Sequence, residues 1–163
     1  MSRTAAPTRT IQDWLDAYAV SHQNPTNKKI HWVCVPGIFW SIIGLLWVIP
    51  QPAWMAALPW LNWATLGLLL IVGFYARLSA PLTVAMVLFT GICYLIAAGL
   101  EAAVGTAGLL ATSVAVFVVL WIGQFIGHKI EGKKPSFFED IQYLMIGPAW
   151  VMAFIFNRLG WRY

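Results

Sequence analysis

The chain has 163 residues, of which 60% are hydrophobic and only 10% are charged. A soluble domain typically carries about 25% charged residues, so this composition excludes a mostly water-facing surface. The net charge of +4 comes from a few Lys and Arg residues that flank apolar runs, which excludes a basic surface for nucleic acid. We therefore predict one all-α integral membrane domain over residues 1–163, a transmembrane helical bundle embedded in a lipid bilayer.

The first predicted element is a short amphipathic helix over residues 10–21, lying in the membrane interface. Four large apolar residues recur on one face at helical spacing: Ile11, Trp14, Leu15 and Tyr18. Thr10 is a suitable N-cap for this helix. Residues 22–27 then predict a turn, because proline disfavours helix at the residue before it and asparagine favours turns.

Four membrane-spanning helices are predicted to follow, since a span requires about 20 mainly apolar residues. Their ranges are 31–49, 61–76, 82–100 and 106–126. The uncharged, Trp-rich and Pro-rich stretch after the first span has the composition of an interfacial belt. Ser136 and Glu139 resemble a capping box that begins a last helix. That helix is apolar over residues 141–156 but contains Gly147 and Pro148, so we predict either a re-entrant segment or a fifth span.

The loop charges predict an orientation. Basic residues precede the first span, join the second to the third, and follow the fourth: Arg3, Arg9, Lys28, Lys29, Arg77, Lys129, Lys133 and Lys134. The only charge in the other loops is Glu101. The positive-inside rule therefore places both termini in the cytoplasm. Arg158 and Arg162 agree with this orientation if the last segment is re-entrant. A bacterial inner membrane and the endoplasmic reticulum both remain possible.

The three histidines of the chain are all predicted at the cytoplasmic interface. His22 and His31 flank the turn before the first span, and His128 follows the fourth span. If these spans are neighbours, the three imidazoles converge, and imidazole binds iron, zinc, copper and nickel. Glu131 lies three residues after His128, on the same helical face, and is a candidate ligand or ligand partner. Interfacial histidines that contact only headgroups or water are the alternative.

Other polar residues are weaker candidates. Lys28 and Lys133 are suited to a substrate carboxylate or phosphate, although topology alone explains such lysines. Asn27 is suited to orient a ligand or substrate, although turn formation explains it equally well. Cys34 and Cys93 lie inside apolar stretches and are predicted to be small buried side chains. No catalytic-triad order, phosphate-binding loop or dinucleotide fingerprint occurs in the sequence.

Two stretches resemble one known family. Residues 18–31 (YAVSHQNPTNKKIH), with Pro36 beyond them, are similar to its N-terminal signature. Residues 124–135 (QFIGHKIEGKKP) are similar to its second signature, after the last long span. The family is that of the membrane-bound, iron(II)-dependent 2-hydroxy fatty acid dioxygenases, which act in the α-oxidation arm of phytosphingosine breakdown.

The resemblance implies that the protein uses Fe2+ and molecular oxygen to shorten a 2-hydroxy fatty acid by one carbon. It implies that His22, His31 and His128 are iron ligands, with Glu131 as a fourth ligand or as an anchor for one. Two alternatives remain on the residues alone. One is a non-catalytic lipid-binding or assembly protein, and the other is a bis-histidine haem protein.

Overall fold

A computed structural model of the protein describes residues 9–58, 60–132 and 143–163, and these residues form helices and connecting turns without any strand. The helices are α1 (Ile11–Ala19), α2 (Pro25–Trp47), α3 (Ala53–Ala56), α4 (Trp63–Ala76), α5 (Ala80–Glu131) and α7 (Ile146–Leu159). The all-α prediction is confirmed. The predicted capping box at Ser136 and Glu139 lies outside the described residues.

Helix α1 forms where the sequence predicts it. The Thr10 side chain accepts a hydrogen bond from the backbone N–H of Asp13, and the Asp13 carboxylate accepts one from the backbone N–H of Thr10. This reciprocal pair satisfies two donors that a helix start otherwise leaves open. The buried face of α1 packs against α7 through Ile11, Leu15 and Tyr18. Its position in a membrane interface stays a prediction.

Helix α2 begins at Pro25, earlier than the predicted start at residue 31. The side chain of Asn24 caps it by accepting from the backbone N–H groups of Thr26 and Asn27 at 2.8 and 3.3 Å. Proline is favourable at the first helical position, where its missing N–H would have no helical partner. The prediction of a turn as far as Asn27 was wrong, because Pro25 and the asparagine before it start a helix here rather than extend the turn.

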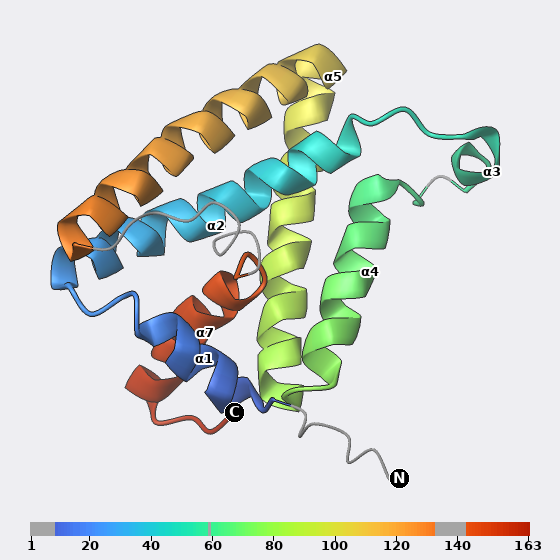
Figure 1. The fold of residues 1–163 in the computed structure, drawn as a ribbon. Helices are drawn as coiled ribbons and strands as arrows, with labels where there is room; N and C mark the ends of the chain where they lie inside the picture. Colours follow the sequence, from blue (N-terminus) through green and yellow to red (C-terminus); the bar gives the residue numbers. More distant parts are fainter. Residues whose placement is uncertain (1–8, 59, 133–142) are drawn as a thin grey trace, which may run out of the picture.

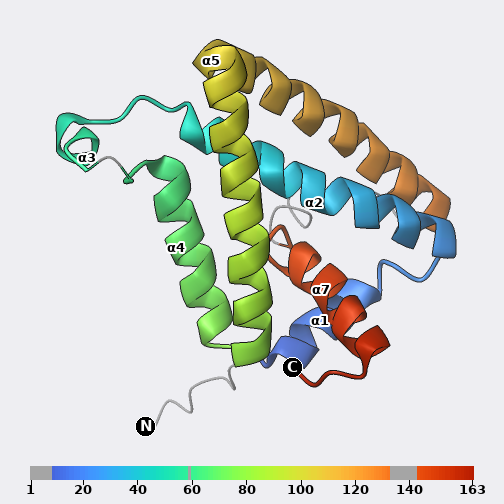
Figure 2. The ribbon, with the colours of Figure 1, turned by 180° about the vertical axis from the view of Figure 1, so that it is seen from behind.

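Helix α5 contains both of the later predicted spans as two arms, residues 80–104 and 106–131. The helix continues past Glu101, so the predicted loop there was wrong and the corner is the single residue Gly105. Its φ of 74° and ψ of 172° lie in a region that is essentially restricted to glycine. The first arm lies beside α4, and the second arm lies beside α2 (Figures 1 and 2). One glycine therefore returns the chain to α2.

Two helices are candidate membrane spans by their length and composition. Helices α2 and α5 are each long and apolar enough to cross a membrane. Helices α4 and α7 have 14 residues each, or about 21 Å at 1.5 Å per residue, which is less than the roughly 30 Å of a hydrocarbon core. The count of about four spans stays a prediction. The short length of α7 agrees with the re-entrant alternative for that segment.

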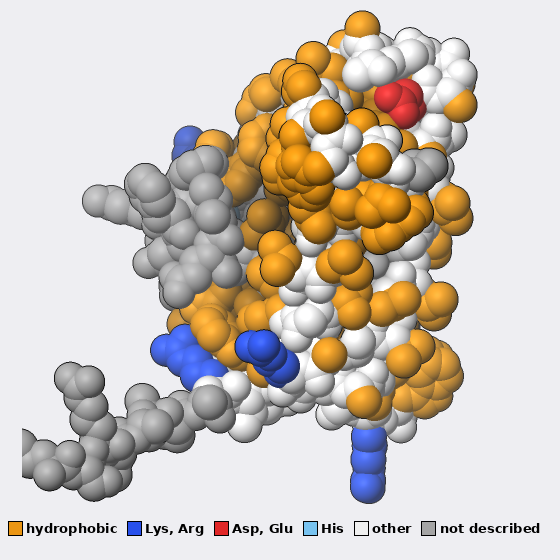
Figure 3. All heavy atoms as spheres, turned by 90° about the vertical axis from the view of Figure 1, so that its right-hand side faces the viewer, with side chains coloured by type: hydrophobic (Ala, Val, Ile, Leu, Met, Phe, Trp, Pro, Cys, Tyr) orange, Lys and Arg blue, Asp and Glu red, His pale blue; other side chains and the backbone are white. Residues whose placement is uncertain are grey.

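Large apolar side chains are exposed along α4 and along both arms of α5. They include Leu69, Leu70, Leu88, Leu95, Val119 and Ile122. Figure 3 shows apolar side chains over much of one face of the molecule, with most of the visible Lys and Arg side chains near its lower end and an acidic side chain near its top. Contiguous apolar surface of this extent is unusual on a protein in water.

Replacement of Gly105 by alanine is expected to destabilise the fold by about 1–3 kcal/mol, because the side chain would be held in a backbone region that only glycine occupies readily. Thermal unfolding of the detergent-purified protein, followed by circular dichroism, would show a lower Tm. Gly99→Ala is the matched control: Gly99 is helical, nothing surrounds its added Cβ within 4 Å, and alanine is favourable inside helices. An equal Tm for both variants would contradict the glycine corner.

Candidate metal centre

The three histidines converge at one end of the α2–α5 pair. His22 lies in the turn after α1, His31 in the second turn of α2, and His128 near the end of α5. Their side chains are 2%, 0% and 4% exposed. One ring nitrogen from each histidine lies within 4.8 Å of the other two. The predicted convergence of the imidazoles is confirmed, and their role as metal ligands stays a prediction.

The imidazole rings stand roughly on edge to one another. The ring centroids are 4.3 Å apart for His22 and His31, 5.0 Å for His31 and His128, and 5.5 Å for His22 and His128. Tyr18 stacks on His22 at 4.0 Å with an interplanar angle of 13°, and Trp150 lies 5.6 Å away on the α7 side. These aromatic contacts restrict the orientation of His22.

Hydrogen bonds to the backbone define the tautomers of two histidines. Nδ1 of His22 lies 2.7 Å from the carbonyl oxygen of Tyr18, and Nδ1 of His31 lies 3.0 Å from that of Asn27. A carbonyl only accepts, so in each case Nδ1 carries the proton. In a neutral ring Nε2 is then the nitrogen with a lone pair. Metal-bound histidines are typically oriented in this way, with the second ring nitrogen donating to a backbone carbonyl or carboxylate.

The donor set fits a single transition-metal ion. Metal–nitrogen bonds of about 2.0–2.1 Å place tetrahedral ligand nitrogens about 3.4 Å apart, so nitrogens within 4.8 Å need only a small inward movement. Three imidazoles suit iron, zinc, copper or nickel and disfavour magnesium and calcium, which prefer oxygen. The chemistry of the donors therefore agrees with the predicted Fe2+ without distinguishing it from zinc.

Glu131 ties the end of α5 to the start of α2. Its carboxylate accepts hydrogen bonds from the backbone N–H of Gln23 at 2.8 Å, from that of Asn24 at 2.9 Å and from the side chain of Asn27 at 2.9 Å. Glu131 lies beyond the predicted span. Burial acts to raise its pKa, but these hydrogen bonds and the charge of His22 outweigh burial and lower the pKa. This arrangement favours an anchoring role, and direct metal binding by Glu131 stays a prediction.

Asn27 holds the histidine-bearing elements together. Its side-chain nitrogen donates to the backbone carbonyl of Ser21 at 3.3 Å and to Glu131. Asn27 is fully buried against Gly127, where an added Cβ would collide with its Oδ1 and lie 3.2 Å from the His31 ring. Since its donors are occupied by the protein, the structure gives Asn27 a positioning role. Substrate binding by Asn27 stays a prediction.

Lys28 lies beside an open hollow that reaches His22. The hollow contains about 630 Å3 of empty space, part of it open to the surroundings, and lies between α1, the start of α2 and α7. His22, Lys28 and Trp150 all contribute to its wall. A substrate carboxylate at the histidines would therefore have an ammonium group at the rim of its site. Lys133, the other predicted lysine, lies outside the described residues.

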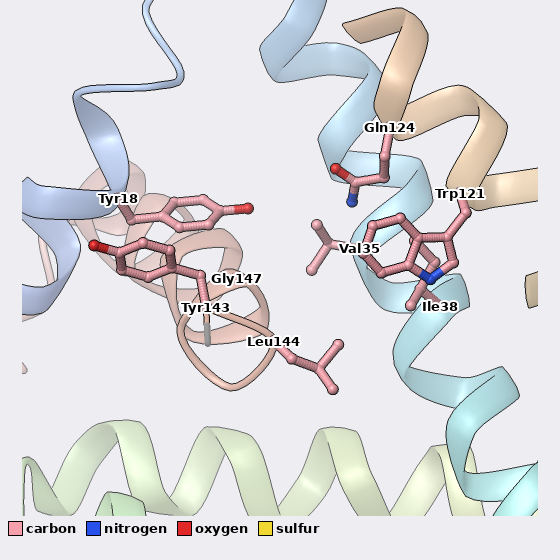
Figure 4. Close-up of a pocket in the computed structure, with 8 residues that line it drawn as sticks. All are labelled: Tyr18, Val35, Ile38, Trp121, Gln124, Tyr143, Leu144 and Gly147. Carbon is pink, nitrogen blue, oxygen red and sulfur yellow. The ribbon is translucent and has the colours of Figure 1, made fainter. Parts of the chain in front are cut away.

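Figure 4 shows a second hollow, which contains about 340 Å3 of empty space, part of it open to the surroundings. Val35 lies one turn after His31 in α2, and Gln124 lies one turn before His128 in α5; both line this hollow. The Gln124 amide and the Tyr18 hydroxyl point into it from opposite sides in Figure 4. The remaining walls are mostly apolar.

Sequence reasoning missed the supporting role of three residues. Tyr18 was assigned to the apolar face of the first helix, although its spacing of four residues from His22 already allowed a contact. Asn24 was predicted as part of a turn, and the structure shows that it caps α2. Gly127 directly precedes His128, and only the packed structure shows that its lack of a side chain admits Asn27 and His31.

The described residues form a helical protein in which three buried histidines converge at one end of two long apolar helices, which defines a helical protein with a candidate metal centre. A comparison with protein families then identifies the family. The chain belongs to the Mpo1-like family, described as 2-hydroxy-palmitic acid dioxygenase Mpo1-like, which matches residues 8–159. The predicted family is confirmed. No curated protein and no solved structure matched the chain.

Replacement of Glu131 by Gln is expected to make the Tm of the protein change less between pH 7 and pH 3. The folded-state pKa of Glu131 is below its ordinary value of 4.5, so its carboxylate contributes fully above about pH 4.5, and the contribution is lost as the pH falls through the folded-state pKa. At pH 7 hydrogen bonds to a charged group contribute about 1–3 kcal/mol. The Tm difference between wild type and variant should thus narrow from pH 7 to pH 3. A pH-independent difference would contradict the anchoring role of the carboxylate.

Proposed function

We propose that the protein is an Fe2+-dependent dioxygenase that shortens a 2-hydroxy fatty acid by one carbon at the cytoplasmic face of a membrane. The observation that carries the proposal is the cluster of His22, His31 and His128, whose ring nitrogens lie within 4.8 Å of one another. The cluster occurs in a chain whose family description names a 2-hydroxy-palmitic acid dioxygenase. The family description supports the reaction and the substrate class, and the cluster supports the residues that would carry the chemistry.

The three histidines would hold the ion through nitrogen donors. When bound, ferrous iron would supply open coordination positions for molecular oxygen and the substrate, while the electrons come from the substrate. The protein's own contribution is to fix the imidazoles before any ligand arrives: backbone carbonyls hold His22 and His31, and Tyr18 stacks on His22. Glu131 keeps the turn that carries His22 attached to the helix that carries His128.

The site also divides a polar side from an apolar side, as an amphiphilic substrate requires. The open hollow at His22 includes Lys28 and Asp16, whereas the hollow beyond Val35 is mostly apolar. A carboxylate would lie at the histidines within reach of the Lys28 charge. The alkyl chain would extend between the helices, where each buried methylene contributes about 0.8 kcal/mol.

The overall reaction balances without a further reductant. A 2-hydroxy acid R–CHOH–COOH and O2 give R–COOH, CO2 and H2O. The bond between C1 and C2 breaks, C2 is oxidised to a carboxyl group, C1 is oxidised to CO2, and O2 accepts the electrons from both carbons. The product is a fatty acid with one carbon fewer, as the α-oxidation assignment requires.

The same set of observations supports a membrane location. The exposed apolar side chains of α4 and α5 suit contact with hydrocarbon, and two helices are long enough to cross it. The histidines lie at the end of α2 and α5 that carries Lys28, Lys29 and Lys129, which the positive-inside rule places in the cytoplasm. A fatty acid within the bilayer would then reach the site from its own leaflet.

A non-catalytic lipid-binding protein is the second candidate, because apolar hollows also suit a lipid that is bound and never transformed. This candidate requires neither a metal nor oxygen consumption. The two functions therefore differ in metal content and in the appearance of a shortened product.

Removal of any one histidine is expected to abolish both metal binding and activity. Protein purified anaerobically in detergent should contain about one iron per chain and convert 2-hydroxyhexadecanoate to pentadecanoate. His22→Ala, His31→Ala and His128→Ala should each lose the iron and the product, because two remaining imidazoles are a much weaker donor set. Elemental analysis and mass spectrometry of the extracted acids measure the two effects.

The matched control is Lys129→Ala, which changes the exposed neighbour of His128 and should keep both iron and activity. Zinc in place of iron would leave a metal site but contradict the oxygenase chemistry. A wild-type protein that takes up no metal after anaerobic addition of Fe2+ would contradict the enzyme and leave the lipid-binding function.

A further inference from the structure

Two hollows follow one another along helix α2, starting one turn beyond His31. The first is lined by Val35 and Ile38, and the second by Phe39, Ile42, Ile43 and Leu46 on the next turns of the same helix. Each contains about 340 Å3 of empty space, part of it open to the surroundings. Leu144 borders both hollows and lies between them. The two hollows thus follow α2 from the turn after His31 toward its far end.

The chemistry of the walls changes along this path. The first hollow contains the Gln124 amide, which is only 7% exposed and points into the space (Figure 4). An amide can both donate and accept hydrogen bonds, so Gln124 offers a polar partner to a molecule in this hollow. The second hollow lies between α2 and α4 and is lined only by apolar residues, including Ala64, Gly67 and Ile71.

This gradient of polarity specifies one kind of occupant. A molecule that fills both hollows must carry a polar group near Gln124 and the histidines and a long, unbranched apolar chain beyond Leu144. A 2-hydroxy fatty acid has this order, because its hydroxyl and carboxyl groups lie at one end. A compact apolar ligand would make no use of the Gln124 amide, and a short hydroxy acid would leave the second hollow unfilled.

We propose that the two hollows bind the alkyl chain of the substrate, that Gln124 contacts its polar end, and that the second hollow determines the preferred chain length. The proposal rests on the proposed function for the identity of the polar end. Leu144 lies where the chain must pass, and Gly67 leaves room in the second hollow because its added Cβ would lie 3.2 Å from Leu46. Each buried methylene contributes roughly fourfold in affinity, so blocking the second hollow should be visible in chain-length preference.

The test compares chain lengths in protein freed of metal, so that binding is measured without turnover. Unlabelled 2-hydroxy acids of 8 and 16 carbons compete with one labelled 2-hydroxy acid in the same detergent for all variants. Gly67→Leu fills the second hollow and should reduce the affinity ratio of the 16-carbon to the 8-carbon acid at least tenfold. Gly73→Leu is the matched control on α4, because its added side chain enters open space, and it should leave the wild-type ratio.

Two further variants keep the result informative if Gly67→Leu does not fold. Leu46→Ala enlarges the second hollow and should shift the preference toward acids longer than 16 carbons. Gln124→Leu should weaken binding of both acids by a similar factor and leave their ratio near the wild-type value. A Gly67→Leu or Leu46→Ala protein with the wild-type chain-length preference would overturn the assignment of the second hollow.

The outcomes separate this inference from the proposed function. If Gly67→Leu and Leu46→Ala change the chain-length preference in binding but the wild-type protein never forms a shortened product, the assignment of the hollows is supported. The proposed dioxygenase function is then contradicted. Formation of the shortened product with a chain-length profile that Gly67→Leu and Leu46→Ala leave unchanged would support the dioxygenase and overturn the path.

Discussion

The close approach of α2 to the second arm of α5 is the constraint on which the site depends. His31 and His128 belong to these two helices, and they meet only because small residues line the contact. An added Cβ at Gly123 would lie 2.8 Å from the sulfur of Cys34, and one at Gly127 would collide with Asn27. Larger side chains here would separate the helices and the two imidazoles with them. The corner at Gly105 also brings His128 to His31, because it turns the chain from the arm beside α4 into the arm beside α2.

Much of this arrangement could be predicted from the sequence, and the missing parts have physical reasons. Hydrophobic periodicity and the Thr10 cap were sufficient for α1, and the three histidines were identified because they all flank the predicted spans at one face. The corner at Gly105 was not predictable, since a helix that continues past Glu101 and then turns at one residue has no strong sequence signal. The start of α2 was placed too late because Asn24 and Pro25 suit either a turn or a helix start.

The anchoring by Glu131 shows where spacing alone is insufficient. Its position three residues after His128 suggested a shared ligand set, and helical geometry does place both on one side of α5. The residues that decide its role come from more than a hundred positions earlier in the chain: the N–H groups of Gln23 and Asn24 and the amide of Asn27. The N–H groups of Gln23 and Asn24 precede the first turn of α2, so they have no helical carbonyl as a partner. The same carboxylate therefore closes the start of α2 and fixes the turn that carries His22.

The packing of the imidazoles also bears on the haem alternative. A bis-histidine haem needs two axial rings on opposite faces of a wide, flat macrocycle. Here all three rings lie with centroids 4.3–5.5 Å apart, and Tyr18 stacks directly on His22. A macrocycle between any two of them would have to displace the third histidine and separate α2 from α5. A single ion would need only a small inward movement of the three converging nitrogens, which lie within 4.8 Å of one another. The geometry thus favours a mononuclear metal site, with the adjoining hollows available to an alkyl chain.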